Sequence, residues 1–418
     1  MSVSVIHTAD WHLGQELHGF GREAEHEAFL AWLLDQIVER EADALVVAGD
    51  IFDTVNPAVS AQRRLYGFLR DVCERAPGIE IIMVGGNHDS AARLELPVPL
   101  LDKGRVRMLG GMPRSDGKPA PEQVLFPLHD KDGKPAVLCA AVPYLRPGDL
   151  PVSEKGPMDG LKKLYAQVLE AAESAREDMG LLVMGHLHMR GGKVSELSER
   201  KILIGGEHAV SDDIFPKSVD YVALGHLHRP QTVAKRDNVR YSGSPFPMSV
   251  TERDYRHSVS VVEFNGGGVK EIKTLDIPRL VDFLRIPEKG SKPLDDVVVA
   301  LEELDLEDPG LDRRPFLEVV VSISTSEPDM RARIDAALEG KPVRLTRTQI
   351  VRETQGDGES LADGTDADVT LDELDPNSVF ALRHKEEYGR VPTKELKTAF
   401  NEILEQVLNP GDETGENK

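Results

Sequence analysis

The sequence predicts an α/β protein with a large first domain, a smaller second domain and a helical C-terminal segment, and three observations support this. Strand-like and helix-like segments alternate through the first half of the chain, which is typical of a parallel sheet with helices packed against it. A second, shorter alternation follows over residues 278–352. Beyond it, residues 353–376 contain nine acidic residues and no Lys or Arg, which is typical of a solvated linker.

The first half of the chain supplies the elements of the large domain. Short apolar runs indicate buried strands at residues 3–6, 44–48, 79–84, 181–184, 202–204 and 221–224. Apolar residues at helical spacing indicate helices within residues 22–40, 65–72 and 160–178. The sequence Asn265-Gly266-Gly267-Gly268 predicts a hairpin turn between two later strands.

The second half predicts a small α/β domain followed by two helices. Strands are expected at 317–323 and 343–348, and helices at 294–304 and 329–338. A helix over 378–388 is expected to end at Gly389, and a further helix over 392–408 carries one apolar face. The resulting divisions are a first domain (1–276), a second domain (277–352), an acidic linker (353–376), a helical pair (377–410) and a disordered tail (411–418).

The composition indicates a cytoplasmic protein with no membrane partner. No run in the 418 residues approaches the ~18 consecutive apolar residues that cross a bilayer. Residues 1–7 predict a first strand rather than a signal peptide. Cys73 and Cys139 lie in apolar segments and cannot form a disulfide framework in a chain of this length, so we expect two buried thiols in a reducing compartment.

The net charge limits how this chain could bind nucleic acid. It is −22 for the whole sequence and still −13 (−22 + 9) outside the acidic stretch 353–376. Phosphate backbones repel such a surface. DNA contacts would therefore need a local basic patch, a metal or a partner protein.

Five polar clusters each follow a predicted buried strand. They are Asp10 with His12, Asp50 with Asp53, Asn87 with His88 and Asp89, His186 with His188, and His226 with His228. Singly, each cluster is more often a capped turn than a set of ligands. If the strands are parallel neighbours, however, their carboxyl ends meet at one edge of a sheet and bring the clusters together.

The side chains of these clusters suit a pair of divalent metal ions. Carboxylates and imidazoles without a thiolate are ligands for Mn, Fe or Zn rather than for a structural cysteine–zinc site. Two neighbouring cations need a bridging ligand, and a carboxylate has the two oxygens to provide it. Such a site polarises a phosphoryl oxygen and lowers the pKa of a bridging water, which yields a hydroxide for in-line attack.

The five clusters, read with their glycines, resemble the motifs of calcineurin-like metallophosphoesterases. The stretches His7-Thr8-Ala9-Asp10-Trp11-His12-Leu13-Gly14 and Arg240-Tyr241-Ser242-Gly243-Ser244-Pro245 are similar, more closely, to the SbcD family of nuclease subunits. The resemblance covers about residues 1–275 with high specificity, and the order of the later domains with less. It implies a two-sheet β sandwich flanked by helices, then a small α/β capping domain and a C-terminal helical pair.

The resemblance also implies roles for individual residues. One metal would be held by Asp10, His12 and His228, the other by Asn87, His186 and His226, with Asp50 bridging them. His88 would protonate the leaving sugar oxygen, and Asp89 would orient the His88 ring. Asp53 stands where some nucleases of this kind carry histidine and receives no role. His188 is expected to be exposed or bonded to backbone, and His7 to lie in the core.

The activity implied by the resemblance is that of a Mn-dependent DNA nuclease. It would be an exonuclease on double-stranded ends and an endonuclease on single-stranded or hairpin DNA, serving DNA repair, recombination and replication. Its partner would be an SbcC-like coiled-coil ATPase, which the C-terminal helical pair would bind. The chain would form a homodimer, and this dimer would be part of a heterotetramer with the ATPase. One alternative is a phosphatase or cyclic-nucleotide phosphodiesterase with the same metal core. Another is a non-catalytic scaffold that has lost its metals.

Overall fold

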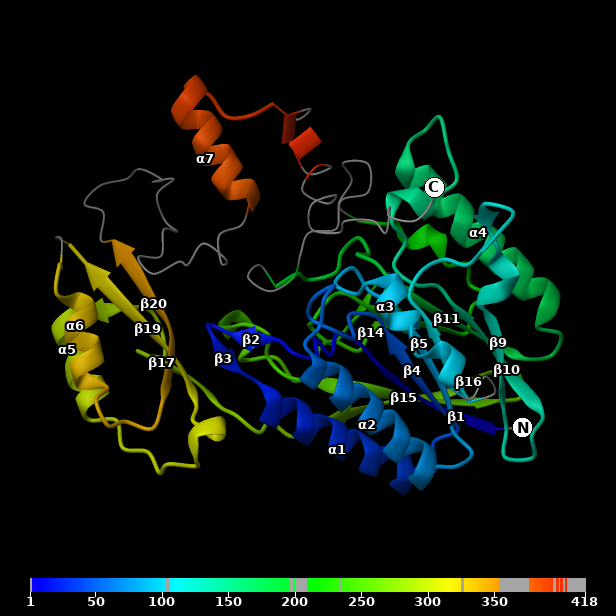
Figure 1. Cartoon of the computed structure of the whole chain (residues 1–418), viewed down its shortest axis with the longest axis horizontal. Coiled ribbons are helices and arrows are strands. Elements are labelled where there is room, and N and C mark those ends of the chain that lie inside the picture. Colours follow the sequence, from blue (N-terminus) through cyan, green and yellow to red (C-terminus); the bar gives the residue numbers. More distant parts are fainter. Residues whose placement is uncertain are drawn as a thin grey trace, which may run out of the picture. The chain divides into compact units, whose positions relative to one another are not determined.

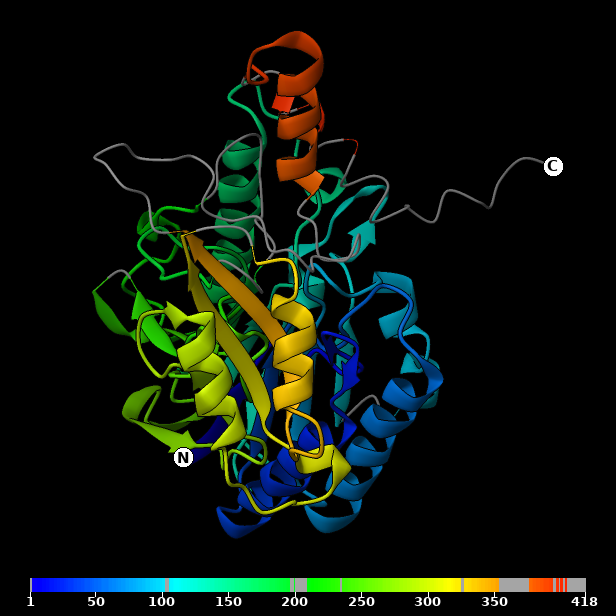
Figure 2. The ribbon, with the colours of Figure 1, turned by 90° about the vertical axis from the view of Figure 1, so that its left-hand side faces the viewer.

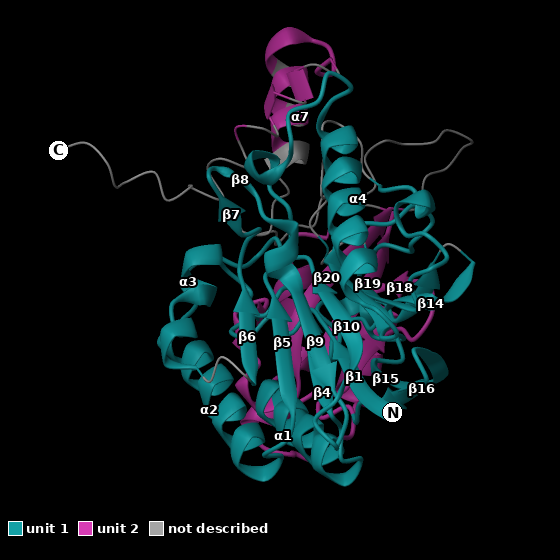
Figure 3. Cartoon of the chain, turned by 90° about the vertical axis from the view of Figure 1, so that its right-hand side faces the viewer, with its two compact units in different colours: residues 1–15, 25–278 teal, residues 16–24, 279–418 magenta. Residues whose placement is uncertain are grey.

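The computed structural model describes residues 2–101, 105–195, 199, 209–233, 235–324, 327–352, 376–393, 396–397, 399–400 and 403. The chain divides into two compact units (Figure 3). The first comprises residues 1–15 and 25–278, and the second comprises residues 16–24 and 279–418. The predictions for 202–204, the tail 411–418, nearly all of the acidic linker and most of the helix at 392–408 fall outside the described residues.

In the described part of the first unit, β7 (Arg114–Ser115) pairs with β8 (Lys118–Pro119), and the other strands form two six-stranded sheets, as the resemblance implied (Figure 1). One sheet has the order β16 (Gly268–Asp276), β15 (Ser258–Asn265), β1 (Ser2–Thr8), β4 (Ala44–Ala48), β5 (Glu80–Val84) and β6 (Val106–Leu109). The other has the order β13 (Gln231–Val233), β14 (Arg236–Tyr241), β12 (Tyr221–Gly225), β11 (Gly180–His186), β10 (Pro135–Ala141) and β9 (Leu125–His129). The strands β1, β4, β5 and β6 are parallel, as are β10, β11, β12 and β14. Turn residues Gly266 and Gly267, both with positive φ, close the predicted hairpin between β15 and β16.

Strand β4 shows why the central strands lie where they do. All five of its residues are buried, as expected for a parallel strand covered on both faces. Side chains of a strand alternate between its two faces. Val46 accordingly packs into the core shared with the second sheet, whereas Val47 packs into the core on the opposite face, beneath the helices.

Helices cover the outer faces of the two sheets. The first sheet carries α1 (Glu23–Glu39) and α2 (Val59–Arg75), which lie beside each other in Figure 1. The second sheet carries α4 (Pro157–Ala175). The apolar face of α2 is buried in the core under the first sheet, so it is an internal contact of this chain. That face consists of Leu65, Phe68, Leu69 and Val72. A short helix, α3 (Ala91–Glu95), packs near β6.

The second unit has its own sheet and core. Its strands are β17 (Phe283–Ile286), β18 (Lys292–Pro293), β19 (Phe316–Ile323) and β20 (Arg344–Arg352), and the other three all pair with β19 in parallel. Helices α5 (Leu294–Glu302) and α6 (Met330–Ala337) lie side by side against this sheet (Figure 2). Val297 and Ile334 meet the strands in one apolar cluster.

Residues 16–24 also belong to the second unit, although the sequence prediction included them in the first domain. They contain a hairpin of two short strands, β2 (Glu16–Leu17) and β3 (Phe20–Gly21). Leu17 packs with Val281 and Phe316 in a small cluster of that unit. Strands of two residues have no periodicity to read in a sequence, which is why the assignment could not be predicted.

The last described helix is α7 (Pro376–Tyr388). Gly389 follows it with φ of 67° and donates its N–H to the Lys385 carbonyl at 2.9 Å, which confirms the predicted helix end. The ring of Phe400 stacks on Phe380 of this helix, with centroids 4.2 Å apart. In the part of the chain that the structure describes, no helix has both the length and the apolar character needed to cross a membrane.

Candidate metal centre

The five polar clusters lie at the carboxyl ends of strands from both sheets. Those of Asp10, Asp50 and Asn87 follow β1, β4 and β5 of the first sheet. His186 ends β11 and His226 follows β12, in the second sheet. From the sequence we expect these clusters at a single sheet edge. The structure instead brings together the corresponding edges of two facing sheets.

The backbone is unusual at four of these residues. Asp10, His12 and Asp50 have φ of 54°, 46° and 47°, and His226 has φ of 103°. Non-glycine residues rarely adopt such angles, which cost of the order of 1–3 kcal/mol each and cluster at functional sites. Hydrogen bonds hold the conformation, because the N–H groups of Asp10 and His12 donate to the carbonyls of Gly49 and Asp50, both at 3.0 Å.

Two glycines permit the close approach of the loops. A side chain at Gly86 would occupy the position of the Asp50 carboxylate. Gly49 has φ of 93°, and a side chain there would meet the ring of His186. The glycines of these motifs are therefore required by the space around the site.

Four histidines of the site are held in the same way. In each, Nδ1 lies close to an oxygen: His12 to Asp53 Oδ1 (3.1 Å), His88 to the Asp53 carbonyl (2.7 Å), His186 to the Ala48 carbonyl (2.9 Å) and His228 to Glu252 Oε1 (2.8 Å). Such oxygens accept hydrogen bonds, so Nδ1 carries the proton in each ring. A ligand ring held in this way can offer Nε2 to a cation once that nitrogen carries no proton.

In His186 and His12, Nε2 faces oxygen atoms that can accept a hydrogen bond or bind a cation. His186 Nε2 lies 2.9 Å from Asn87 Oδ1 and 3.4 Å from Asp50 Oδ2, and His12 Nε2 lies 3.7 Å from the same Asp50 oxygen. Asp10 Oδ1 accepts the N–H of His226 at 2.8 Å. Asp10 Oδ2 and His12 Nε2 are buried, and no described residue forms a hydrogen bond with either. A cation would satisfy these buried groups.

Two overlapping groups of side chains have the spacing of metal sites. The ligand atoms of Asp50, His186 and His226 lie within 4.8 Å of one another, as do those of His12, Asp50 and His88. Asp50 belongs to both groups, which is the position of a bridging carboxylate. The nitrogen and oxygen donors suit Mn, Fe or Zn, so these residues fit a divalent metal pair.

The pKa values of the site residues in the metal-free protein also indicate that positive charge stabilises this site. Burial raises the pKa of Asp10. Burial acts likewise on Asp50, but His186 and His88 outweigh it and hold the pKa of that carboxyl well below its usual range. Burial lowers the pKa of His228, but Glu252 outweighs it and raises that pKa to about 10. In the same way Asp50 raises the pKa of His186 to about 9. In the metal-free protein, the protons on His186 and His228 therefore supply positive charge that metal ions would otherwise bring.

The prediction that Asp89 orients His88 is wrong. The Asp89 carboxylate accepts three backbone N–H groups, from Gly86 at 2.8 Å, Phe52 at 2.9 Å and Ile51 at 3.0 Å. Although Asp89 follows His88 directly in the sequence, Nδ1 of the His88 ring lies 2.7 Å from the Asp53 carbonyl instead. Asp89 thus ties the loop after β4 to the loop after β5, and its role is structural support.

Sequence reasoning missed three acidic residues beside the histidines. Asp53 received no role but contacts His12 with its side chain and His88 with its backbone. Glu252 is fully buried against the His228 ring, and Glu199 accepts the His228 N–H at 2.7 Å. The spacing Gly49-Asp50-x-x-Asp53 was a visible signal for Asp53. Glu252 has no such signal, because only the fold places it near His228.

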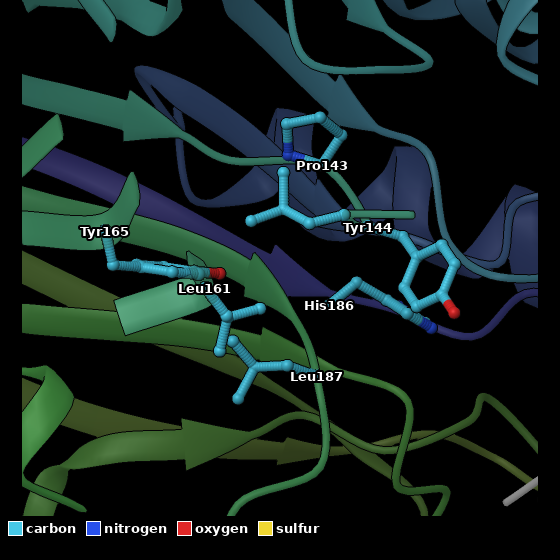
Figure 4. A pocket seen from close by; sticks show the side chains of 7 residues that line it. Pro143, Tyr144, Leu161, Tyr165, His186 and Leu187 are labelled. Atoms are coloured by element: carbon cyan, nitrogen blue, oxygen red, sulfur yellow. The ribbon is translucent and has the colours of Figure 1, made fainter. Parts of the chain in front are cut away.

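An apolar pocket lies beside His186, in the group that His186 forms with Asp50 and His226. Its lining consists of Pro143, Tyr144, Leu145, Leu161, Tyr165, His186 and Leu187 (Figure 4). The rings of Tyr144 and His186 meet edge to face, with centroids 6.2 Å apart. Packing of this kind fixes the His186 ring in the direction that its hydrogen bond to Ala48 sets.

His7 and His188, which the sequence analysis also singled out, lie beside residues of the site. His7 is buried, faces the Tyr221 hydroxyl with Nδ1 at 3.0 Å, and has its pKa lowered to about 3 by burial. It is the core histidine that the sequence predicts. His188 is half-buried, its carbonyl accepts the N–H of Val210, and its ring centroid lies 6.0 Å from that of His226.

Comparison with known proteins identifies the family. A family model described as calcineurin-like phosphoesterase matches residues 3–230, and one described as type 5 capsule protein repressor C-terminal domain matches residues 279–388. The SbcD subunit of nuclease SbcCD from Rhodobacter capsulatus is 40% identical over 358 residues, which cover 84% of this chain and 88% of that protein. The protein of the same name from Escherichia coli is 31% identical, and the match covers 91% of this chain and 92% of that protein. The one from Bacillus subtilis is 34% identical, and the match covers 63% of this chain and 67% of that protein. The chain therefore belongs to the SbcD family of calcineurin-like phosphoesterases.

Proposed function

We propose that this protein is a metal-dependent nuclease subunit that hydrolyses the phosphodiester bonds of DNA. Its substrates are double-stranded ends, cut as an exonuclease, and single-stranded or hairpin DNA, cut as an endonuclease. The observation that carries the proposal is the pair of ligand groups that share Asp50. The relatives are named as the SbcD subunit of nuclease SbcCD, which supports the choice of substrate.

Seven residues are proposed to hold two divalent metal ions, which we take to be Mn. Asp10, His12 and His228 bind one ion, Asn87, His186 and His226 bind the other, and Asp50 bridges them. Bound divalent cations supply Lewis-acid activation of the phosphoryl group and of water. The protein contributes fixed geometry, because each of three ligand rings is held at Nδ1 by an oxygen of another residue.

His88 is the proposed general acid. The Asp53 carbonyl holds Nδ1, and the ring lies beside His12 with centroids 4.7 Å apart. One ring nitrogen of His88 lies within 4.8 Å of the ligand atoms of His12 and Asp50. As the bond between phosphorus and the sugar oxygen breaks, His88 gives its Nε2 proton to that oxygen. Asp53 is a positioning residue in this scheme and takes the part that the sequence analysis gave to Asp89.

The assembly is proposed on the same basis. An SbcC-like ATPase binds the C-terminal segment 377–410, and the protein acts as a homodimer within a heterotetramer in cytoplasmic DNA repair. Residues 277–352 form the capping domain. Deleting residues 378–408 should abolish co-purification with the ATPase and spare Mn-dependent cleavage. Intact co-purification of the shortened chain would contradict this part.

A nuclease assay tests the central proposal. Blunt and hairpin DNA are incubated with the full chain and Mn or Mg, with and without the ATPase. We expect cleavage with Mn, and none by Asp50→Ala, which loses the shared carboxylate. Turnover of phosphomonoesters or cyclic nucleotides with no cutting of DNA would overturn the proposal in favour of a phosphatase or cyclic-nucleotide phosphodiesterase. A purified protein that binds no divalent metal would indicate a scaffold instead.

A further inference from the structure

The loop after β10 is fixed to the loop that carries Asn87 and His88. The N–H of Tyr144 donates to the Gly85 carbonyl at 2.8 Å. Two residues later, Nη2 of Arg146 donates to the Asp89 carbonyl at 2.7 Å. A segment of the second sheet is thus held against the catalytic loop of the first sheet.

Tyr144 lies between Arg146 and the candidate metal centre. The guanidinium carbon of Arg146 is 5.6 Å from the centroid of the Tyr144 ring. The same ring meets His186 edge to face at 6.2 Å, as Figure 4 shows for Tyr144 and His186. One aromatic ring therefore separates this positive charge from a proposed metal ligand, and the cation–π contact helps to fix the guanidinium.

In the part of the chain that the structure describes, the hydrogen-bond partner of the Arg146 guanidinium is a backbone carbonyl and not a carboxylate. Among the described residues, none forms an ion pair with its guanidinium, although the protein is strongly acidic. Asp149 is close in sequence, but its Oδ2 accepts the backbone N–H of Arg146 at 2.9 Å and its Oδ1 faces Arg114 at 3.7 Å. Other arginines of the surface do have acidic partners, such as Arg75 with Asp35.

A half-buried, immobilised guanidinium of this kind matches a phosphate group. Arginine presents five N–H donors in a planar fork, and the Asp89 carbonyl takes one of them. The rest of the fork has the geometry that binds phosphate oxygens in pairs. We propose that Arg146 binds a non-scissile phosphate of the substrate strand, beside the phosphodiester that is cut. Arg146 then favours polynucleotides over phosphoesters that have a single phosphate, and this inference rests on the proposed nuclease function.

The test is the salt dependence of DNA binding by the full chain. A fluorescent hairpin DNA is titrated in EDTA, so that no strand is cut, at NaCl concentrations from about 50 to 200 mM, where phosphate contacts dominate the change in affinity. For Arg146→Gln, we expect the slope of log Kd against log salt to fall by about 0.7–0.9, which is the loss of one phosphate contact. Arg146→Lys keeps a point charge, so its slope should stay close to that of the natural protein while its affinity lies between the two.

Arg114→Gln is the matched control. It removes the same charge from a side chain that reaches the loop of Arg146, but Arg114 is already paired with Asp149 and bonded to the Gly148 carbonyl. Its slope should equal that of the natural protein. An unchanged slope for Arg146→Gln, an equal change in both Gln variants, or no salt-dependent binding by the natural protein would overturn the inference. If Arg146→Gln fails to fold, equal affinity of Arg146→Lys and the natural protein overturns it. Failure of the nuclease proposal is seen separately, as absent cleavage with Mn.

Discussion

Glu252 Oε1 lies 2.8 Å from Nδ1 of His228, and both side chains are buried. The other oxygen of Glu252 accepts the N–H of Met248 at 2.7 Å, so the carboxylate is itself held in place. A carboxylate in this position orients a ligating imidazole and makes its Nε2 more basic. The relationship predicts that Glu252 controls metal affinity although it is not a proposed ligand.

Replacing Glu252 with Gln should weaken the binding of one metal ion about 10–100-fold, the usual effect of losing such a partner. The amide keeps the shape but carries no charge to stabilise the ring. Isothermal titration of the metal-free protein with Mn measures the change. Glu263→Gln is the control, because Glu263 is partly buried on β15 and bonds to Ser4 instead of to a proposed ligand. Equal Mn affinity in both variants would contradict the prediction.

Metal binding should strengthen as the pH rises. In the metal-free protein, Asp50 outweighs burial to raise the pKa of His186 to about 9, and Glu252 does the same for His228, to about 10. Both values exceed the ~6.5 of an unfolded histidine. These protons therefore stabilise the metal-free fold fully below pH ~6.5, and the contribution is lost as the pH rises through the folded values.

Because metal must displace these protons, the rise in melting temperature caused by Mn should grow between about pH 6.5 and 8.5. Thermal unfolding with EDTA and with Mn, at matched pH values, measures the difference. His228→Gln removes one of the two protonated rings and should show a smaller dependence. A rise that is the same at every pH would show that no protons are displaced.

The strands could be predicted from the sequence because buried strands consist of short runs of apolar residues. The run 44–48 predicted β4 to the residue, since a strand covered on both faces is apolar throughout. The polar clusters could be located because each interrupts such a run at a strand end. Their assembly from two facing sheets required the family resemblance.

The parts that escaped prediction depend on contacts between distant segments. Glu252 is 24 residues from His228 in the chain, and nothing in its own neighbourhood marks it. The ring of His88 could turn to either of two nearby oxygens, and only the loop geometry selects the carbonyl of Asp53 over the carboxylate of Asp89. Local sequence supplies the chemical groups, whereas hydrogen bonds across the loops determine their orientation.

Replacing Asp89 should lower the stability of the fold, whereas replacing Asp53 should lower metal affinity. Asp89→Asn leaves one oxygen for the three N–H groups that the carboxylate accepts, so the free energy of unfolding should fall by about 1–3 kcal/mol. Asp53→Asn keeps the backbone bond to His88 and should change stability little while weakening metal affinity through His12. Urea unfolding and Mn titration separate the two effects. The reverse pattern would return the orienting role to Asp89.

His88→Ser should abolish cleavage while leaving metal and DNA binding intact. The ring is proposed to transfer a proton and not to coordinate, and loss of a general acid lowers the rate by about 10²–10⁴-fold. Metal content by mass spectrometry and DNA affinity in EDTA are measured beside the cleavage rate, with Asp50→Ala as the variant that should lose metal. The distances alone place His88 in one group with His12 and Asp50, so the experiment decides between two roles that geometry permits. Loss of metal from His88→Ser would make His88 a ligand and would leave the proton of the leaving group to another residue.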